Sequence, residues 1–212
     1  DNGIKFFDGR GYKLPDEIEE QIEKTVQCSK DELPRPIGVA VGRVVEVEDA
    51  LEQYIEHALT TFSGSLEGLK IVVDCANGAS YQVTPRVLRS LGAQVISLHN
   101  TPDGTNINLG SGSTHPESLM KAVVEHEADI GFAHDGDADR VLAVDEKGNL
   151  VDGDQIMVMC ALNLKKQANL RNNTVVVTVM SNLGLHQALK KVGISVKETK
   201  VGDRYVFEEM LA

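Results

Sequence analysis

Residues 129–140 read DIGFAHDGDADR, a short apolar run followed at once by three aspartates at alternate positions. The run 129–133 has the length and composition of a buried β-strand. In an open parallel sheet, ligands bind at the carboxyl ends of the strands. We therefore expect Asp135, Asp137 and Asp139 to lie on a loop at such an edge, where the small residues between them let the carboxylates converge.

The three aspartates have the chemistry of a cation site. Carboxylates in this number are hard oxygen ligands that suit Mg²⁺, which also keeps room for a phosphate oxygen. Arg140 follows directly and offers a planar fork for a phosphate group. A solvated acidic turn is the simpler alternative, but three carboxylates within five residues repel one another. The sequence thus predicts a Mg²⁺ site with Arg140 as a second positive group, and His134 beside it as an orienting or packing residue.

Two other chemistries use a similar spacing. An EF-hand loop also begins D-x-D-x-D, and Glu146 falls at its twelfth position, but the sixth position needs glycine and is Arg140 here. The predicted flanks are also strands rather than helices. A phosphatase with an aspartyl nucleophile places D-x-D after a strand, but normally carries Thr or Val where Asp139 stands. Both alternatives are weaker than a Mg²⁺ site.

Strands and helices alternate on both sides of this loop. Strands are predicted at 69–73, 94–98, 129–133, 141–144, 150–151, 174–180 and 195–199, and helices at 78–91, 116–127, 154–166, 183–192 and from 203 onward. This alternation predicts an α/β fold with mixed, mostly parallel sheets flanked by helices. The last part holds only two strand–helix repeats, so we expect it to belong to a larger, truncated domain.

The first part of the chain is organised differently. We expect a hairpin over residues 4–14, then a helix that begins at Pro15 and carries an apolar stripe at spacing four. A strand is predicted at 42–47 and a helix at about 48–60. Residues 62–68, rich in Gly and Ser, read as a linker.

Composition narrows the class of protein. The 212 residues include 21 basic and 32 acidic side chains, and the net charge of −11 argues against a nucleic-acid partner. No apolar run approaches about 18 residues, so no membrane span is expected. Three scattered cysteines form neither a disulfide framework nor a zinc site, which favours a cytoplasmic protein. No signal peptide is visible, and because the chain starts with Asp rather than Met we expect a preceding segment.

Residues 135–140 resemble the metal-binding loop of the α-D-phosphohexomutase family, and the resemblance extends over essentially the whole chain. Residues 1–5 and 74–79 look like family motifs, and longer stretches are similar to the phosphoglucosamine mutase branch, namely 102–108, 112–117, 151–154, 178–184 and 201–206. The resemblance implies repeated βα domains of the phosphohexomutase type. Residues 1–66 would be the C-terminal part of domain 1, 67–149 a complete domain 2 with the metal loop, and 150–212 the N-terminal part of domain 3.

The resemblance also implies a reaction. A phosphoserine would interconvert glucosamine 6-phosphate and glucosamine 1-phosphate through a bisphosphorylated sugar, with Mg²⁺ held by Asp135, Asp137, Asp139 and a phosphoserine oxygen. Lys5 matches the family lysine beside the phosphoserine, and Lys200 matches a sugar-phosphate contact. The implied partners are a phosphorylated amino sugar and a sugar bisphosphate, while the charge and the hydropathy pattern indicate no nucleic acid and no membrane. A homodimer is implied for the full-length protein.

The chain departs from the family pattern at both ends. The Ser-His-Asn-Pro phosphoserine loop is expected just before residue 1, and the sugar-specificity loop and the phosphate-binding fourth domain are expected beyond residue 212. We therefore expect the isolated chain to lack mutase activity. Two alternatives stay open: a phosphomannomutase or phosphoglucomutase of the same family, and a non-catalytic module that binds divalent cations.

Overall fold

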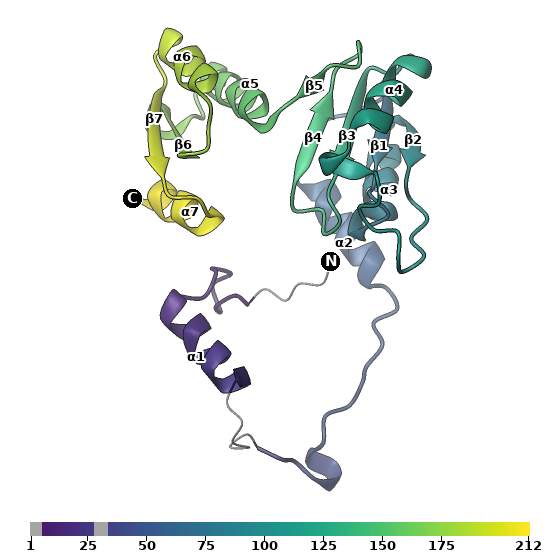
Figure 1. Cartoon of the computed structure of the whole chain (residues 1–212), viewed down its shortest axis with the longest axis vertical. Coiled ribbons are helices and arrows are strands. Elements are labelled where there is room, and N and C mark those ends of the chain that lie inside the picture. The colour runs from purple at the N-terminus through teal and green to yellow at the C-terminus, as the bar shows by residue number, and fades with distance from the viewer. Residues whose placement is uncertain (1–5, 28–33) are drawn as a thin grey trace. The chain divides into compact units, whose positions relative to one another are not determined.

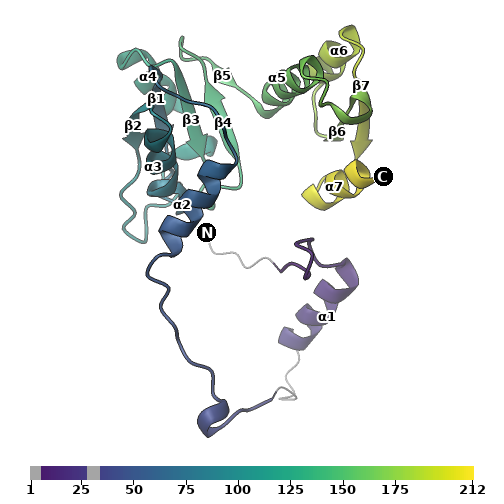
Figure 2. The ribbon, with the colours of Figure 1, turned by 180° about the vertical axis from the view of Figure 1, so that it is seen from behind.

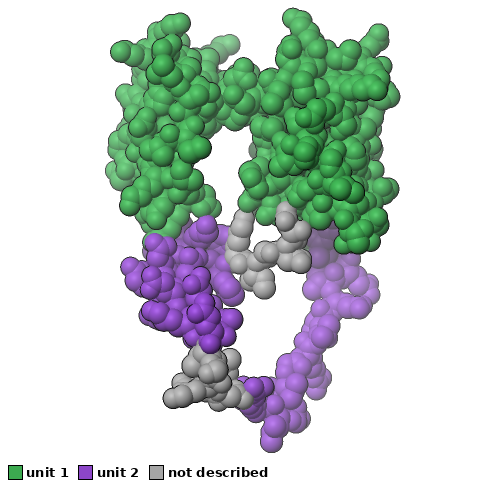
Figure 3. All heavy atoms as spheres, in the orientation of Figure 1, with its two compact units in different colours: residues 1, 53–212 green, residues 2–52 purple. Residues whose placement is uncertain are grey.

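The computed structural model describes residues 6–27 and 34–212. The chain divides into two compact units, residues 2–52 and residues 53–212, which Figure 3 draws in purple and green. Each unit is described by itself below.

Over its described residues, the N-terminal unit contains little regular structure apart from one helix and the first residues of a second. An antiparallel bridge joins Phe7 to Lys13, and the Asp8 carboxylate closes the turn by accepting the N–H groups of Arg10 (2.8 Å) and Tyr12 (3.0 Å). Helix α1 follows at Asp16–Gln27, with acidic residues in its first turn that favour the positive end of the helix dipole. The predicted hairpin and helix are thus confirmed over the residues that the structure describes.

The prediction of a strand at residues 42–47 is wrong. These residues are irregular, and no described segment pairs with them in a ladder. Their valines are largely exposed, with Val44 at 97% and Val45 at 78%. A valine-rich run gains its strand preference from packing and burial, and neither is present here. The helix predicted next is confirmed as α2, Ala50–Thr60, with Ile55 buried.

A five-stranded mixed sheet forms the core of the next region (Figure 1). Its strands are β1 (Lys70–Asp74), β2 (Gln94–Leu98), β3 (Ile130–His134), β4 (Val141–Val144) and β5 (Leu150–Val151). The order is β2-β1-β3-β4-β5, with β1 parallel to both β2 and β3 and the last two strands antiparallel. The register sets Asp74 beside Ala133, so β1 and β3 end together at one edge of the sheet.

Helices cover both faces of this sheet (Figures 1 and 2). Helix α4, Glu117–Glu125, packs its buried Leu119 and Val123 against Val72 on one face. Helix α3, Val83–Ser90, lies on the other face, where Nη2 of Arg89 donates to the Ser97 hydroxyl at 3.3 Å. The result is a three-layered α/β/α sandwich, as the alternation of elements predicted.

A glycine lets α4 approach the middle of the sheet. A Cβ at Gly131 would lie 2.6 Å from Cγ2 of Val123 and 2.9 Å from Cδ1 of Leu119. Both of these side chains are fully buried. The packing of α4 on β3 therefore depends on the missing side chain at this position.

The C-terminal part of the chain builds a second, two-stranded parallel sheet from β6 (Thr174–Thr178) and β7 (Ser195–Thr199). Its helices are α5 (Gly153–Lys166), α6 (Leu183–Lys191) and α7 (Asp203–Leu211). The buried core consists of Ala161, Val177, Leu185, Leu189 and Ile194. Helix α5 begins with a capping box, in which Asp152 and Gln155 satisfy each other's backbone N–H groups.

The fold class predicted from the sequence is confirmed, because both sheets are flanked by helices and most strand pairs are parallel. Several boundaries differ: the strand expected to run to residue 180 ends at Thr178, and the helix expected over 78–91 is a short 3-10 turn followed by α3. In the part of the chain that is described, no helix is both long and apolar enough to cross a membrane.

We predict that Gly131→Ala lowers the stability of the first sheet by about 1–3 kcal/mol, because the added methyl group overpacks the contact between α4 and β3. The measurement is the thermal unfolding midpoint of the purified chain. Gly153→Ala is the matched control, because nothing lies within 4 Å of a Cβ at that position, and it should leave the midpoint unchanged or raise it slightly. Equal midpoints for the two variants would contradict the packing argument.

Candidate functional site

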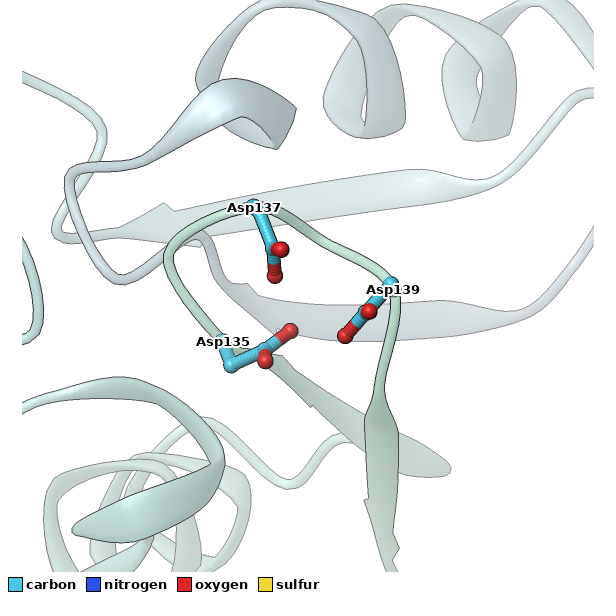
Figure 4. Close-up of side chains that lie close together, drawn as sticks. All are labelled: Asp135, Asp137 and Asp139. Carbon is cyan, nitrogen blue, oxygen red and sulfur yellow. The ribbon is translucent and has the colours of Figure 1, made fainter. Parts of the chain in front are cut away.

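The three aspartates of the opening motif lie on the loop that joins β3 to β4. One carboxylate oxygen from each of Asp135, Asp137 and Asp139 lies within 4.8 Å of the others. Figure 4 shows the three carboxylates turned toward one another across this loop. Asp135 is 2% exposed, whereas Asp137 and Asp139 are open to solvent. The convergence that the sequence predicted is present.

Arg140 fixes the buried member of this set. Its backbone N–H donates to Oδ1 of Asp135 at 3.0 Å, and its Nε donates to Oδ2 at 2.8 Å. The same Nε lies 3.4 Å from Oδ1 of Asp139. The hydrogen bond to Asp135 raises the pKa of the guanidinium above its usual value. The group that the sequence suggested for phosphate thus also serves as the partner of a candidate metal ligand.

A left-handed residue turns the loop between the second and third aspartates. Ala138 has φ of 61° and donates its N–H to the carbonyl of Asp135 at 3.1 Å. This conformation is costly for a residue with a Cβ, and such strain is typical of functional loops. The turn brings Asp139 back toward Asp135.

The loop after β1 braces the aspartate loop from one side. The N–H of Ala79 donates to the carbonyl of Gly136 at 2.8 Å. A Cβ at Gly78 would lie 2.2 Å from that same oxygen. Only a glycine allows the two backbones to approach this closely.

The segment before α4 braces the loop from the other side. A Cβ at Gly112 would lie 2.3 Å from the carbonyl oxygen of His134, and its φ of +71° also favours glycine. The N–H of Gly112 donates to the buried carboxylate of Asp74 at 3.0 Å. The peptide before Asp135 and the carbonyl of Gly136, one residue after it, are therefore both in contact with a neighbouring backbone.

His134 contacts helix α3. Its Nε2 lies 3.2 Å from the hydroxyl of Thr84 on α3, so the ring packs on the α3 face of the sheet. Burial lowers the pKa of this histidine, which favours the neutral ring. This is the placement that the sequence suggested for an orienting or packing residue.

The structure brings together only part of the predicted site. Asp135, Asp137, Asp139 and Arg140 form one cluster. Lys200 follows β7 in the second sheet, where its Nζ lies 5.8 Å from the centre of the Tyr205 ring. Lys5 lies outside the described residues.

Three supporting residues lie in stretches that carry the family resemblance, but the sequence-based prediction gave them no part in the site. Asp74, Gly78 and Gly112 shape the site through backbone contacts. Asp74 carried one local signal, since it ends a strongly apolar strand at the edge where ligands bind. The contacts of Gly112 link residues distant in sequence and have no local signature.

The donor set fits a small divalent cation. Three carboxylates of which one is buried and pre-oriented supply the oxygen ligands that Mg²⁺ prefers, and the two exposed ones leave room for water or phosphate. The flanking elements are strands β3 and β4 rather than helices, which disfavours an EF-hand.

Most of the chain matches two domain models of one known protein family. Residues 52–148 match phosphoglucomutase/phosphomannomutase alpha/beta/alpha domain II, and residues 152–212 match domain III of the same family. Proteins named phosphoglucosamine mutase are similar along the whole chain. The one from Desulforamulus reducens is 64% identical over 211 residues, and the one from Carboxydothermus hydrogenoformans is 63% identical. Each alignment covers all of this chain and 48% of the relative, so the chain spans about half the length of these curated relatives.

Solved structures agree with this placement. A phosphoglucomutase/phosphomannomutase family protein from Burkholderia thailandensis aligns with a TM-score of 0.65 and 26% identity, over 76% of this chain and 35% of that one. A Thermus thermophilus protein designated a phosphomannomutase aligns with a TM-score of 0.67, over 95% of this chain and 46% of that one. At 23% identity, the second likeness concerns the fold alone.

We predict that the two described cysteines differ sharply in reactivity. Cys75 follows β1 and is fully buried, and burial raises the pKa of its thiol to about 11, so almost no thiolate exists at pH 8. Cys160 is exposed on α5. Iodoacetamide at pH 8, with peptide mass spectrometry to locate the label, should modify Cys160 and spare Cys75 until denaturant is added. Equal labelling of both in the folded chain would show that the loop after β1 is not closed.

Proposed function

The chain belongs to the phosphoglucomutase/phosphomannomutase family, and we propose that it forms the central part of a phosphoglucosamine mutase. The observation that carries this proposal is the convergence of Asp135, Asp137 and Asp139 at the carboxyl edge of the first sheet. The relatives at 63–64% identity support the choice of branch within the family.

The proposed reaction interconverts glucosamine 6-phosphate and glucosamine 1-phosphate. A phosphoserine gives its phosphoryl group to the sugar, and the serine then regains the other phosphate from the bisphosphorylated intermediate. Phosphoryl transfer is mainly a problem of positioning and of neutralising charge on the moving group. The family's phosphoserine motif has no counterpart within residues 1–212, so the isolated chain should be inactive.

The chain's own residues would serve this reaction by holding and orienting charge. Asp135, Asp137 and Asp139 would bind Mg²⁺, which when bound neutralises charge on the transferred phosphoryl group. Arg140 holds Asp135 in place and presents a guanidinium beside the site. Lys5 would neutralise charge or assist proton transfer beside the phosphoserine, and Lys200 would contact the sugar phosphate.

The organisation proposed for the whole protein follows from this assignment. Residues 1–66, 67–149 and 150–212 would be parts of domain 1, domain 2 and domain 3. The partners would be a phosphorylated amino sugar and a sugar bisphosphate. We also propose a cytoplasmic homodimer that uses neither nucleic acid nor membrane.

We predict that Asp137→Asn combined with Asp139→Asn weakens Mn²⁺ binding to the chain by at least about tenfold, or about 1.4 kcal/mol. Both side chains are exposed, so the fold should survive the loss of their charge. Titration followed by electron paramagnetic resonance measures the free Mn²⁺.

Glu146→Gln is the matched control for that pair, because Glu146 is a nearby acidic residue that an EF-hand would use at its twelfth position. It should leave the affinity unchanged. A loss of affinity in Glu146→Gln, or none in the double variant, would contradict the assignment of ligands.

We predict that the full-length protein containing this chain turns over glucosamine 6-phosphate with a kcat/KM at least about tenfold above that for glucose or mannose 6-phosphate. The family's serine upstream of residue 1 should carry phosphate, as intact-mass spectrometry would reveal.

A preference for mannose or glucose phosphate would favour the other mutases of the family, and an unphosphorylated, inactive protein would favour a non-catalytic cation-binding module. Turnover by the isolated 212-residue chain would refute the proposed role of the upstream serine.

A further inference from the structure

Asp74 is a charged side chain with no access to solvent. It ends β1 and is 0% exposed. Its Oδ1 accepts the N–H of Ala76 at 2.9 Å, and its Oδ2 accepts the N–H of Gly112 at 3.0 Å. The Ser118 hydroxyl donates to Oδ2 at 3.4 Å. A buried carboxylate is costly unless such donors surround it, so this one has a structural reason to be there.

One oxygen of Asp74 controls the contact that precedes Asp135. The Gly112 N–H bound to Oδ2 belongs to the residue whose α-carbon faces the carbonyl of His134, where a Cβ would lie at 2.3 Å. A shift of Gly112 would therefore displace the peptide that leads into Asp135.

The other oxygen controls the contact that follows Asp135. Oδ1 holds Ala76, which begins the tight turn toward Gly78. Gly78 and Ala79 then meet the carbonyl of Gly136, through the close approach at Gly78 and the 2.8 Å hydrogen bond from Ala79. The two oxygens of Asp74 thus position two separate segments, at Ala76 and at Gly112. These segments contact the aspartate loop after and before Asp135.

We propose that Asp74 is a positioning residue for the cation site, setting the place of Asp135 through these two segments. The inference rests on the proposed function only in requiring that Asp135, Asp137 and Asp139 bind a divalent cation. Asp74 itself would not touch the cation. Its effect is transmitted by backbone contacts, which deform little because the segments are packed without side chains between them.

Asp74→Asn is a sharp test because the amide cannot satisfy both segments. Each carboxylate oxygen faces a backbone N–H, so either orientation of the amide sets its NH₂ group against one donor. One of the two backbone hydrogen bonds to residue 74 must therefore break. Asp74→Glu keeps the charge but displaces the carboxylate, which separates positioning from simple electrostatic attraction of the cation.

Asp129→Asn is the matched control. Asp129 also ties strand backbone in the β1–β3 pair, accepting the N–H of Lys70 at 2.7 Å, but it lies at the opposite, amino edge of the sheet. Both substitutions replace a carboxyl group by an amide and disturb one backbone hydrogen bond, and Asp74 in addition lies 3.0 Å from Nδ1 of His99. Only Asp74 contacts the segments that border the aspartate loop.

The experiment is a Mn²⁺ titration of the 212-residue chain, with thermal unfolding recorded for every variant. We expect Asp74→Asn and Asp74→Glu to weaken Mn²⁺ binding by about tenfold or more, and Asp129→Asn to stay within about twofold of the original chain. Folded Asp74 variants that bind as tightly as the original chain would overturn the inference while leaving the cation site intact. No binding by the original chain would overturn the cation site and this inference together.

A second measurement keeps the test decisive if the Asp74 variants do not fold. Coupling is reciprocal, so a cation that depends on these segments must also stabilise them. Saturating Mg²⁺ should slow amide hydrogen exchange at Gly112 and Ala76 in the unaltered chain, and leave exchange at Lys70 unchanged. Identical exchange at Gly112 and Ala76 with and without Mg²⁺ would overturn the inference.

Discussion

Parallel pairing of β1 with β3 is the constraint on which the site depends. Because both strands run in the same direction and the register sets Asp74 beside Ala133, β1 and β3 end at the same edge of the sheet. The loops that follow are therefore neighbours although they lie far apart in sequence. An antiparallel pairing would send them to opposite edges, and the aspartate loop would have no support from β1.

The support itself is made of backbone rather than side chains. Gly78 contacts the carbonyl group of Gly136, one residue after Asp135, and Gly112 contacts the peptide before Asp135. Backbone contacts do not depend on side-chain rotamers. The loop is therefore held in one arrangement before any cation binds. Asp135 is then oriented by Arg140, and the two exposed aspartates complete the set of oxygens.

The sequence predicted the parts of this account that are local. Strand–helix alternation and the spacing of Asp135, Asp137 and Asp139 are readable within short windows, and the structure contains both. The strand expected at 42–47 failed because valine content alone does not supply a pairing partner. The role of Asp74 and the hydrogen bonds from Arg140 to Asp135 could be recognised only in the folded structure, in which Gly112 meets a carboxylate 38 residues earlier. Lys5 lies outside the described residues, and Lys200 follows β7 of the second sheet.

The central claim is that the loop between β3 and β4 binds a divalent cation through its three aspartates. Anomalous diffraction from crystals of the chain grown with Mn²⁺ tests it most directly, because the anomalous signal locates the metal without assumptions about its ligands. The account predicts a peak at about 2.0–2.3 Å from a carboxylate oxygen of Asp135, Asp137 and Asp139. A peak bound by other residues, or an ordered loop without one at saturating Mn²⁺, would contradict it.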